Sequence, residues 1–259
     1  MIDYEKISSI ERLLNNKKII YSKVLNYSFG IKCVKLITND GQKYIVKYYK
    51  NFNNKFNAVF SETKNLKFLN NLKPNLFPTV YTENKEYLII SFLNNNNKKP
   101  NYTKDDLLNA ITEIHTFNSD KYGFDFDTQI GGLRQKNEKN DNWVNFYRDN
   151  RLSYVYELIN SSNSMGKNIN NKIEDFINHL QDFIPKKPKA SLLHGDLWEG
   201  NILFNNFNFV GFIDPGSYYG HNELEIAYLR WFNPIFIDDN FLDKYNNIIN
   251  VNKEYLNYE

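Results

Sequence analysis

The apolar residues of this chain recur first at the spacing of strands and later at the spacing of helices. Three strand-like runs over residues 19–27, 31–38 and 42–49 follow a short amphipathic segment over residues 3–15. Asn39-Asp40-Gly41 separates the last two runs and predicts a hairpin turn, because glycine readily accepts a positive φ. The chain therefore begins with a helix and an antiparallel sheet.

The pattern changes after a polar stretch at residues 94–101. Before that stretch, residues 55–70 repeat apolar positions at helical spacing and residues 87–92 form another strand-like run. After it, helical spacing dominates, and a strand pair is expected around residues 202–213. Together these elements predict an α+β fold of two lobes, residues 1–93 and 94–259. The later helix candidates are residues 107–114, 142–159 and 170–183.

Composition excludes several classes of function. The 259 residues are 41% hydrophobic and 24% charged, with a net charge of +2 and scattered lysines. This balance argues against a nucleic acid or an anionic membrane as partner. No apolar run reaches the length of a membrane span, and the first residues lack a signal-peptide core. The single cysteine, Cys33, fits a reducing cytosol and is interpreted as a small buried hydrophobe. We expect a cytoplasmic protein that acts on a small molecule, with a monomer favoured.

The most informative stretch is His194-Gly195-Asp196-Leu197-Trp198-Glu199-Gly200-Asn201, followed by Asp214. Phosphoryl transfer from ATP needs a base beside the acceptor hydroxyl and oxygen ligands for Mg²⁺. Kinase catalytic loops supply an Asp, an Asn five residues later, and a second Asp on a following turn. We predict that Asp196 is the general base and that Asn201 and Asp214 bind Mg²⁺.

Four upstream segments fit nucleotide binding. Ile45 and Lys47 share one face of a predicted strand, so Ile45 can pack on adenine and Lys47 can reach the phosphates. Glu62 lies on the following helix, where it can pair with Lys47. The backbone of Ser91, Phe92 and Leu93 can meet the edge of adenine. The turn around Ser28 to Gly30 is a glycine-poor candidate phosphate loop.

Three polar residues near the predicted site have structural interpretations. His194 precedes the base by two residues and is interpreted as a buried orienting group rather than a second base. Glu223 and Glu225 precede an apolar helix start and are interpreted as first-turn carboxylates, not as catalysts.

These motifs resemble those of the fructosamine kinases, also called ketosamine-3-kinases. The resemblance rests on the stretch from His194 to Asn201, on Ile213-Asp214-Pro215, and on Tyr218-Tyr219-Gly220-His221. A second block runs from Tyr122-Gly123-Phe124-Asp125 to Arg151-Leu152 and resembles the substrate-side insertion of that family. The family has a protein-kinase-like fold, shared with aminoglycoside and choline phosphotransferases.

The resemblance implies an ATP-dependent kinase that phosphorylates the O3 hydroxyl of a ketosamine, such as a ribulosamine, erythrulosamine or fructosamine. Such a phosphate destabilises the adduct, so the implied role is repair of glycated amines or proteins. Trp198 would lie against the sugar, and an anchor for the catalytic loop is its alternative role. Gln135 and Asn137 would lie on the substrate side.

Departures from the family pattern keep two alternatives open. Lys139 stands where the family usually has an aromatic residue, and the chain ends soon after Tyr245, where the family usually adds further helix. One alternative is a phosphotransferase for another small acceptor, such as an aminoglycoside or an amino alcohol. The mixed charges of residues 122–152 do not support the acidic pocket that such cationic acceptors favour. The other alternative is a nucleotide-binding protein without catalysis.

Overall fold

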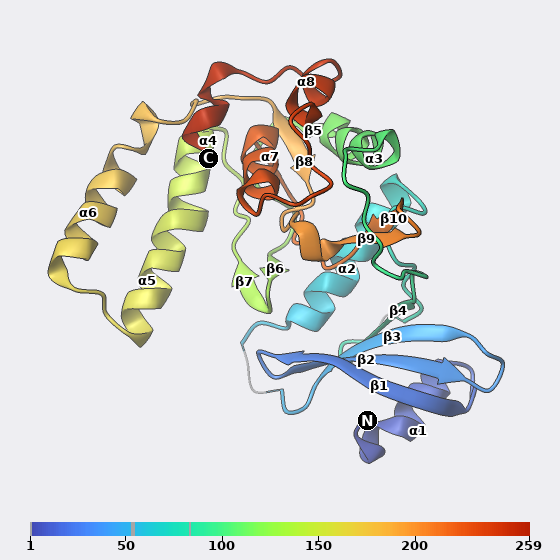
Figure 1. The fold of residues 1–259 in the computed structure, drawn as a ribbon. Coiled ribbons are helices and arrows are strands. Elements are labelled where there is room, and N and C mark those ends of the chain that lie inside the picture. The colour runs from blue at the N-terminus through green and yellow to red at the C-terminus, as the bar shows by residue number, and fades with distance from the viewer. Residues whose placement is uncertain (1, 53–54, 83) are drawn as a thin grey trace. The chain divides into compact units, whose positions relative to one another are not determined.

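The protein is described by a computed structural model that covers residues 2–52, 55–82 and 84–259. Helices and antiparallel strand pairs make up the fold (Figure 1), so the predicted α+β class is confirmed. The α-helices in this part of the chain are α1 (Tyr4–Leu13), α2 (Ala58–Leu72), α3 (Asp105–Thr116), α4 (Trp143–Tyr147), α5 (Ser153–Ser162), α6 (Lys167–Asn178), α7 (Asn222–Trp231) and α8 (Phe241–Asn246). The strands are β1 (Ile19–Ser28), β2 (Ile31–Thr38), β3 (Lys43–Tyr49), β4 (Tyr87–Ser91), β5 (Asn118–Ser119), β6 (Thr128–Ile130), β7 (Leu133–Gln135), β8 (Ala190–Leu193), β9 (Ile202–Asn205), β10 (Asn208–Phe212) and β11 (Tyr218–Gly220).

The chain divides into two compact units. The first unit contains Met1–Lys98, Thr128–Arg134 and Asn201–Gly216. The second unit contains Lys99–Asp127, Gln135–Gly200 and Ser217–Glu259. Each unit collects segments that are far apart in the sequence. The division into functional lobes after residue 93 stays a prediction.

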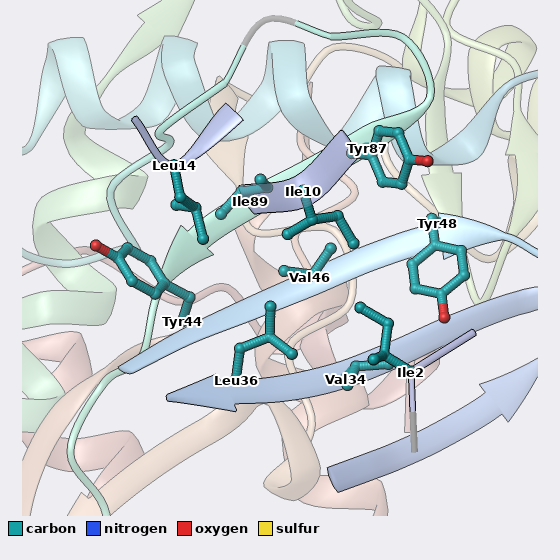
Figure 2. Packing of buried hydrophobic residues seen from close by; sticks show 10 residues of the cluster. All are labelled: Ile2, Ile10, Leu14, Val34, Leu36, Tyr44, Val46, Tyr48, Tyr87 and Ile89. Atoms are coloured by element: carbon teal, nitrogen blue, oxygen red, sulfur yellow. The ribbon is translucent and has the colours of Figure 1, made fainter. Parts of the chain in front are cut away.

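The first unit is built on a four-stranded antiparallel sheet in the order β1-β2-β3-β4. Side chains alternate between its two faces, as strand geometry requires. One face, with Val34 and Val46, packs against Ile10 of α1 and Leu14 just after that helix in an apolar core (Figure 2). Since Lys47 follows Val46 directly, Lys47 points to the opposite face, away from this core.

The predicted strands and their turns match the structure closely. The hairpin between β2 and β3 has Gly41 at φ +79°, the left-handed conformation that its sequence predicted. The helix expected over residues 55–70 begins at Ala58, because Asn57 is extended and its side chain accepts a hydrogen bond from the Phe60 N–H at 3.0 Å. The strand pair expected around residues 202–213 is formed by β9 and β10.

The second unit is mainly helical and contains a small sheet in the order β11-β8-β5. Helices α3 and α7 both contact β8, the strand that ends immediately before His194. The helix predicted over residues 142–159 is divided by a π-helical turn at Arg148–Leu152, which separates α4 from α5. Within the described residues, no helix combines the length and apolar character needed to cross a bilayer.

Candidate active site

The face of the first unit's sheet opposite α1 lines a cavity of about 760 Å³. Its lining includes five of the residues predicted to bind nucleotide and one predicted metal ligand: Ile45, Lys47, Ser91, Phe92, Leu93 and Asp214. The four strands β1–β4 each contribute side chains, because every second residue of a strand faces the same side. Leu203 and Ile213 add apolar surface from β9 and from the segment after β10.

Lys47 and two carboxylates form an ion-paired cluster at this cavity. The Lys47 Nζ atom donates to both carboxylate oxygens of Glu62, at 2.8 and 3.0 Å, and to Asp214 Oδ1 at 2.6 Å. Lys47 is 8% exposed and Glu62 is 4% exposed, whereas the Asp214 side chain is 40% exposed. The expected Lys47–Glu62 pair is therefore formed, and Asp214 is its solvent-facing member.

Burial and charge act in opposite directions on this cluster. Burial alone lowers the pKa of Lys47, but the charges of Asp214 and Glu62 outweigh it and hold the pKa above its usual range. Burial raises the pKa of Glu62 to about 7, and the Lys47 charge offsets this only in part. Lys47 is therefore a permanent cation, and Glu62 is the more easily neutralised partner.

The segment around Asp214 has a constrained backbone. Asp214 has φ +55°, a left-handed conformation that is uncommon outside glycine and is often found at functional sites. The Asn65 side chain on α2 donates to the Pro215 carbonyl at 3.0 Å, one turn of helix after Glu62. The Ile213 N–H donates to the Asn201 carbonyl at 3.0 Å. These bonds fix the backbone that carries both predicted magnesium ligands.

Cys33 lies opposite Lys47 in the pairing of β2 with β3 and lines the same cavity. Burial raises the pKa of its thiol to about 11, although the Lys47 charge acts against this. A thiol with this pKa stays protonated near neutral pH and is a poor nucleophile. This environment agrees with Cys33 as a small, largely apolar wall residue.

The candidate phosphate loop is a two-residue turn with an unexpected neighbour. Phe29 and Gly30 both have positive φ, at +49° and +75°, as the tight hairpin between β1 and β2 requires. The Phe29 ring packs on Gly132, where an added Cβ would lie 2.9 Å from the Phe29 Cβ. Gly132 belongs to the block predicted to lie on the substrate side, and no pattern in the sequence marks its contact with Phe29.

The loop after β8 carries the predicted base in the second unit. Gly195 has φ +84°, which lets the chain turn sharply between His194 and Asp196. His194 is completely buried, and its ring Nδ1 accepts a hydrogen bond from the Asp196 N–H at 3.3 Å. These contacts agree with an orienting rather than a proton-transferring role for His194.

Glu225 corrects an interpretation made from the sequence. It lies in the first turn of α7, as expected, but it is buried and binds the loop after β8 instead of capping the helix. Its carboxylate accepts the Gly195 N–H at 2.6 Å, the His194 N–H at 2.9 Å and the His115 ring Nε2 at 2.9 Å. Although burial raises the pKa of Glu225, these donors more than offset the effect and lower it.

The bond network continues beyond Glu225 into the interior of the second unit. The His115 ring Nδ1 lies 2.7 Å from the Tyr245 hydroxyl, which also accepts from the Asn222 side chain at 2.9 Å. The His115 ring therefore links the Glu225 carboxylate to the Tyr245 hydroxyl. In the sequence, this network is indicated only by Glu225, a glutamate at the start of an otherwise apolar helix.

Trp198 follows the predicted base by two residues and is 38% exposed. Its ring lies against Gly200, where an added Cβ would approach the ring to 2.4 Å. Phe232 packs on Trp198 with ring centroids 5.7 Å apart. Gly200 therefore leaves room for the indole, and a substrate role for Trp198 stays a prediction.

Gln135 and Asn137 are both buried in the second unit. The Asn137 Oδ1 accepts from the Arg151 guanidinium at 2.8 Å, and its side-chain NH₂ donates to the Phe126 carbonyl at 3.1 Å. The Arg151 guanidinium in turn lies 4.1 Å from the centroid of the Tyr218 ring. A substrate role for Gln135 and Asn137 stays a prediction, and these contacts give Asn137 a structural role.

Comparisons with known proteins agree with this arrangement. A family model described as "Fructosamine kinase" matches residues 13–258. A probable ketoamine kinase of Enterococcus faecium is 33% identical over 149 residues, which are 57% of this chain and 53% of that protein. A chloroplastic protein-ribulosamine 3-kinase of Arabidopsis thaliana is 30% identical over 173 residues, 66% of this chain and 51% of that protein. The chain thus spans about half the length of these two relatives.

Solved structures support the fold. A putative fructosamine-3-kinase of Thermobifida fusca has a TM-score of 0.82 at 18% identity, covering 96% of this chain and 86% of that one. APH(2″)-IIa, in a ternary complex with streptomycin and ATP, has a TM-score of 0.64 at 15% identity, covering 100% of this chain and 86% of that one. The predicted two-lobed, kinase-like α+β fold is confirmed by these likenesses.

Proposed function

The chain belongs to the fructosamine kinase family, and from this premise we propose that it transfers the γ-phosphoryl group of ATP to the O3 hydroxyl of a ketosamine. The observation that carries the proposal is the cluster of Lys47, Glu62 and Asp214 at a cavity of about 760 Å³. A buried, permanently charged lysine held by one glutamate and one exposed aspartate suits the binding of a nucleotide phosphate.

Nucleotide binding uses the remaining lining of that cavity. Ile45 and Ile90 offer apolar surface for the adenine ring, and both line the cavity. The backbone of Ser91, Phe92 and Leu93 meets the edge of the base. Lys47 leaves Asp214 for the phosphates and keeps its bonds to Glu62, which positions its ammonium group.

The predicted magnesium ligands have the chemistry that the ion prefers. The Asp214 carboxylate and the Asn201 side-chain carbonyl are hard oxygen donors. The Asp214 side chain is accessible and Asn201 is buried, and the backbone bond from Ile213 to Asn201 ties their two segments together, so the chemistry of this donor pair fits the ion. Bound magnesium supplies positive charge that stabilises the phosphate oxygens during transfer.

Asp196 is the proposed general base. The O3 oxygen of the acceptor attacks the γ-phosphorus, the bond from that phosphorus to the β,γ-bridging oxygen breaks, and ADP leaves. The O3 proton passes to the Asp196 carboxylate. The backbone of this loop is held by Glu225 through the amides of His194 and Gly195, which preorganises the base.

The acceptor is proposed to be a ribulosamine, erythrulosamine or fructosamine. Trp198 presents an exposed indole that can pack on the C–H face of a sugar. The Arabidopsis relative is named a protein-ribulosamine 3-kinase, which favours a ribulosamine on a protein or small amine. A 3-phosphate destabilises such an adduct, so the proposed role is deglycation. A cytoplasmic location and a monomeric state stay predictions.

The test is ATP consumption with magnesium against a ribulosamine, an erythrulosamine, a fructosamine and an aminoglycoside. We expect turnover on a ketosamine and a loss of about 10³-fold in Asp196→Asn, with ATP affinity unchanged by calorimetry. Turnover on the aminoglycoside alone would replace the proposed substrate class. ATP binding without transfer to any acceptor would support a non-catalytic protein.

A further inference from the structure

We propose that Tyr228 is a positioning residue for the base, and that its hydroxyl fixes the Asp196 carboxylate for proton acceptance. The inference rests on the proposed function, in which Asp196 takes the acceptor proton. The Tyr228 hydroxyl donates to Asp196 Oδ1 at 3.3 Å, and both side chains are half-buried. Neither the sequence motif nor the family comparison assigns a role to Tyr228.

The hydroxyl is a stable donor at physiological pH. Burial, together with the charge of Asp196, raises the pKa of Tyr228 to about 12. A phenol with this pKa keeps its proton at neutral pH. A phenol that faces a carboxylate makes a charge-assisted contact, and at 3.3 Å this one is longer than an ordinary O–H···O hydrogen bond.

The position of Tyr228 is set by contacts on either side of it. Three residues earlier on α7, Glu225 binds the amides of His194 and Gly195, which fixes this helix against the loop. Residues three apart share a helix face, so Tyr228 is presented to the same loop one turn later. Phe232 meets the Tyr228 ring edge to face, at 5.4 Å between centroids and 89° between planes.

This arrangement gives α7 two functions in the loop. Glu225 holds the backbone before the base, and Tyr228 holds the side chain of the base itself. An aspartate on a loop rotates freely about χ1 and χ2 unless a neighbour restrains it. A carboxylate that is not held in the productive orientation slows the proton transfer without changing how the nucleotide binds.

Tyr228→Phe removes the hydroxyl and keeps the ring that packs on Phe232. We expect kcat to fall about 10-fold, with the KM for ATP and the melting temperature essentially unchanged. The matched control is Tyr156→Phe, which removes a hydroxyl that donates to the Glu174 carboxylate at 2.7 Å on the exposed side of α5. The control should leave kcat unchanged.

An activity-independent measurement tests the contact itself. The ¹³Cζ resonance of Tyr228, assigned by its loss in Tyr228→Phe, should shift in Asp196→Ala, whereas the Tyr156 resonance should not. Wild-type kcat in Tyr228→Phe, in an enzyme that is otherwise active, would overturn the inference while the proposed function stands. A Tyr228 resonance that does not shift in Asp196→Ala would also overturn the inference, and this measurement does not need an active enzyme. The absence of turnover on every acceptor would instead defeat the proposed function.

Discussion

Two buried glutamates show how differently the two units use the same side chain. Glu62 in the first unit binds one partner, the Lys47 ammonium, with both oxygens. Glu225 in the second unit binds two backbone amides and the His115 ring. Burial raises the pKa of Glu62, whereas the pKa of Glu225 is lowered despite burial.

The two glutamates differ in the mobility of the groups that they bind. The Lys47 ammonium bonds to both Glu62 and Asp214, so its bond to Glu62 can persist when its other partner changes. The amides of His194 and Gly195 cannot move without moving the loop, so Glu225 is part of the framework that carries Asp196. We infer that Glu62 tunes a ligand-binding group and Glu225 fixes a backbone.

The strongest test of this contrast removes the Glu225 carboxylate. Glu225→Ala leaves two amides and the His115 ring without their acceptor in the interior, which costs about 3 to 5 kcal/mol of unfolding free energy. Urea denaturation measures the loss. Glu157→Ala, on the exposed surface of α5, is the control and should change stability by less than about 0.5 kcal/mol. Equal stabilities for the two variants would contradict the framework role.

The corresponding change in the first unit should affect binding more than stability. Glu62→Gln keeps the size of the side chain but removes the charge that holds Lys47. We expect the KM for Mg-ATP to rise about 10-fold, because the lysine is less well positioned for the phosphates. The unfolding free energy should change by about 1 kcal/mol or less, since burial already opposes the charged form. A large loss of stability in Glu62→Gln, with an unaltered KM for Mg-ATP, would show that Glu62 is a structural residue and does not position Lys47 for binding.

The pH dependence of stability should have opposite signs for the two residues. The folded pKa of Glu225 lies below its unfolded value, so its contribution is present above about pH 4.5 and is lost as the pH falls. The folded pKa of Glu62 lies near 7, so its contribution is present below about pH 4.5 and is lost as the pH rises toward 7.

Unfolding free energies measured from pH 3.5 to 8 in wild type, Glu225→Gln and Glu62→Gln separate these contributions. Glu225→Gln should flatten the acid side of the curve, and Glu62→Gln should flatten the decline between about pH 4.5 and 7. Each residue contributes at most about 1.4 kcal/mol per pH unit in its own range. If the plots of unfolding free energy against pH were parallel for the three proteins, neither the lowered pKa of Glu225 nor the raised pKa of Glu62 would be supported.

The smallest expected effect on activity comes from Gly200, in the segment that follows Asp196 and carries Trp198. Gly200→Ala places a Cβ against the Trp198 ring, which must shift. We expect a rise of about 3-fold in the KM for the acceptor and no change in the KM for ATP. Trp198→Ala should produce a larger rise in the acceptor KM. If Gly200→Ala instead lowered stability and left both KM values alone, Trp198 would be an anchor for the loop.

Much of the first unit was predictable because its cues are local. Alternation over β2 and β3, with a glycine-containing turn between them, specified both strands and the face that carries Lys47. The start of α2 was placed three residues too early, because apolar spacing alone does not mark the first helical residue, which is set here by the local cap of Asn57.

The second unit was less predictable because its key bonds join distant segments. His115 and Glu225 are 110 residues apart, and the Glu225 carboxylate meets the Gly195 amide across 30 residues. No period or spacing in a single sequence marks such pairs. The sequence therefore favoured a first-turn role for Glu225, and no pattern in it indicated a role for Tyr228.

Most of the strand and helix pattern, and the spacing of Asp196, Asn201 and Asp214, could be read from the amino-acid order alone. These features depend on side-chain period, turn chemistry and order along the chain, all of which act locally. The bond of Lys47 to Asp214, 167 residues away, and the attachment of the loop after β8 to α7 became visible only in the folded protein. The physical reason is that a buried charge finds its partner through packing, and packing brings together residues that the sequence keeps apart.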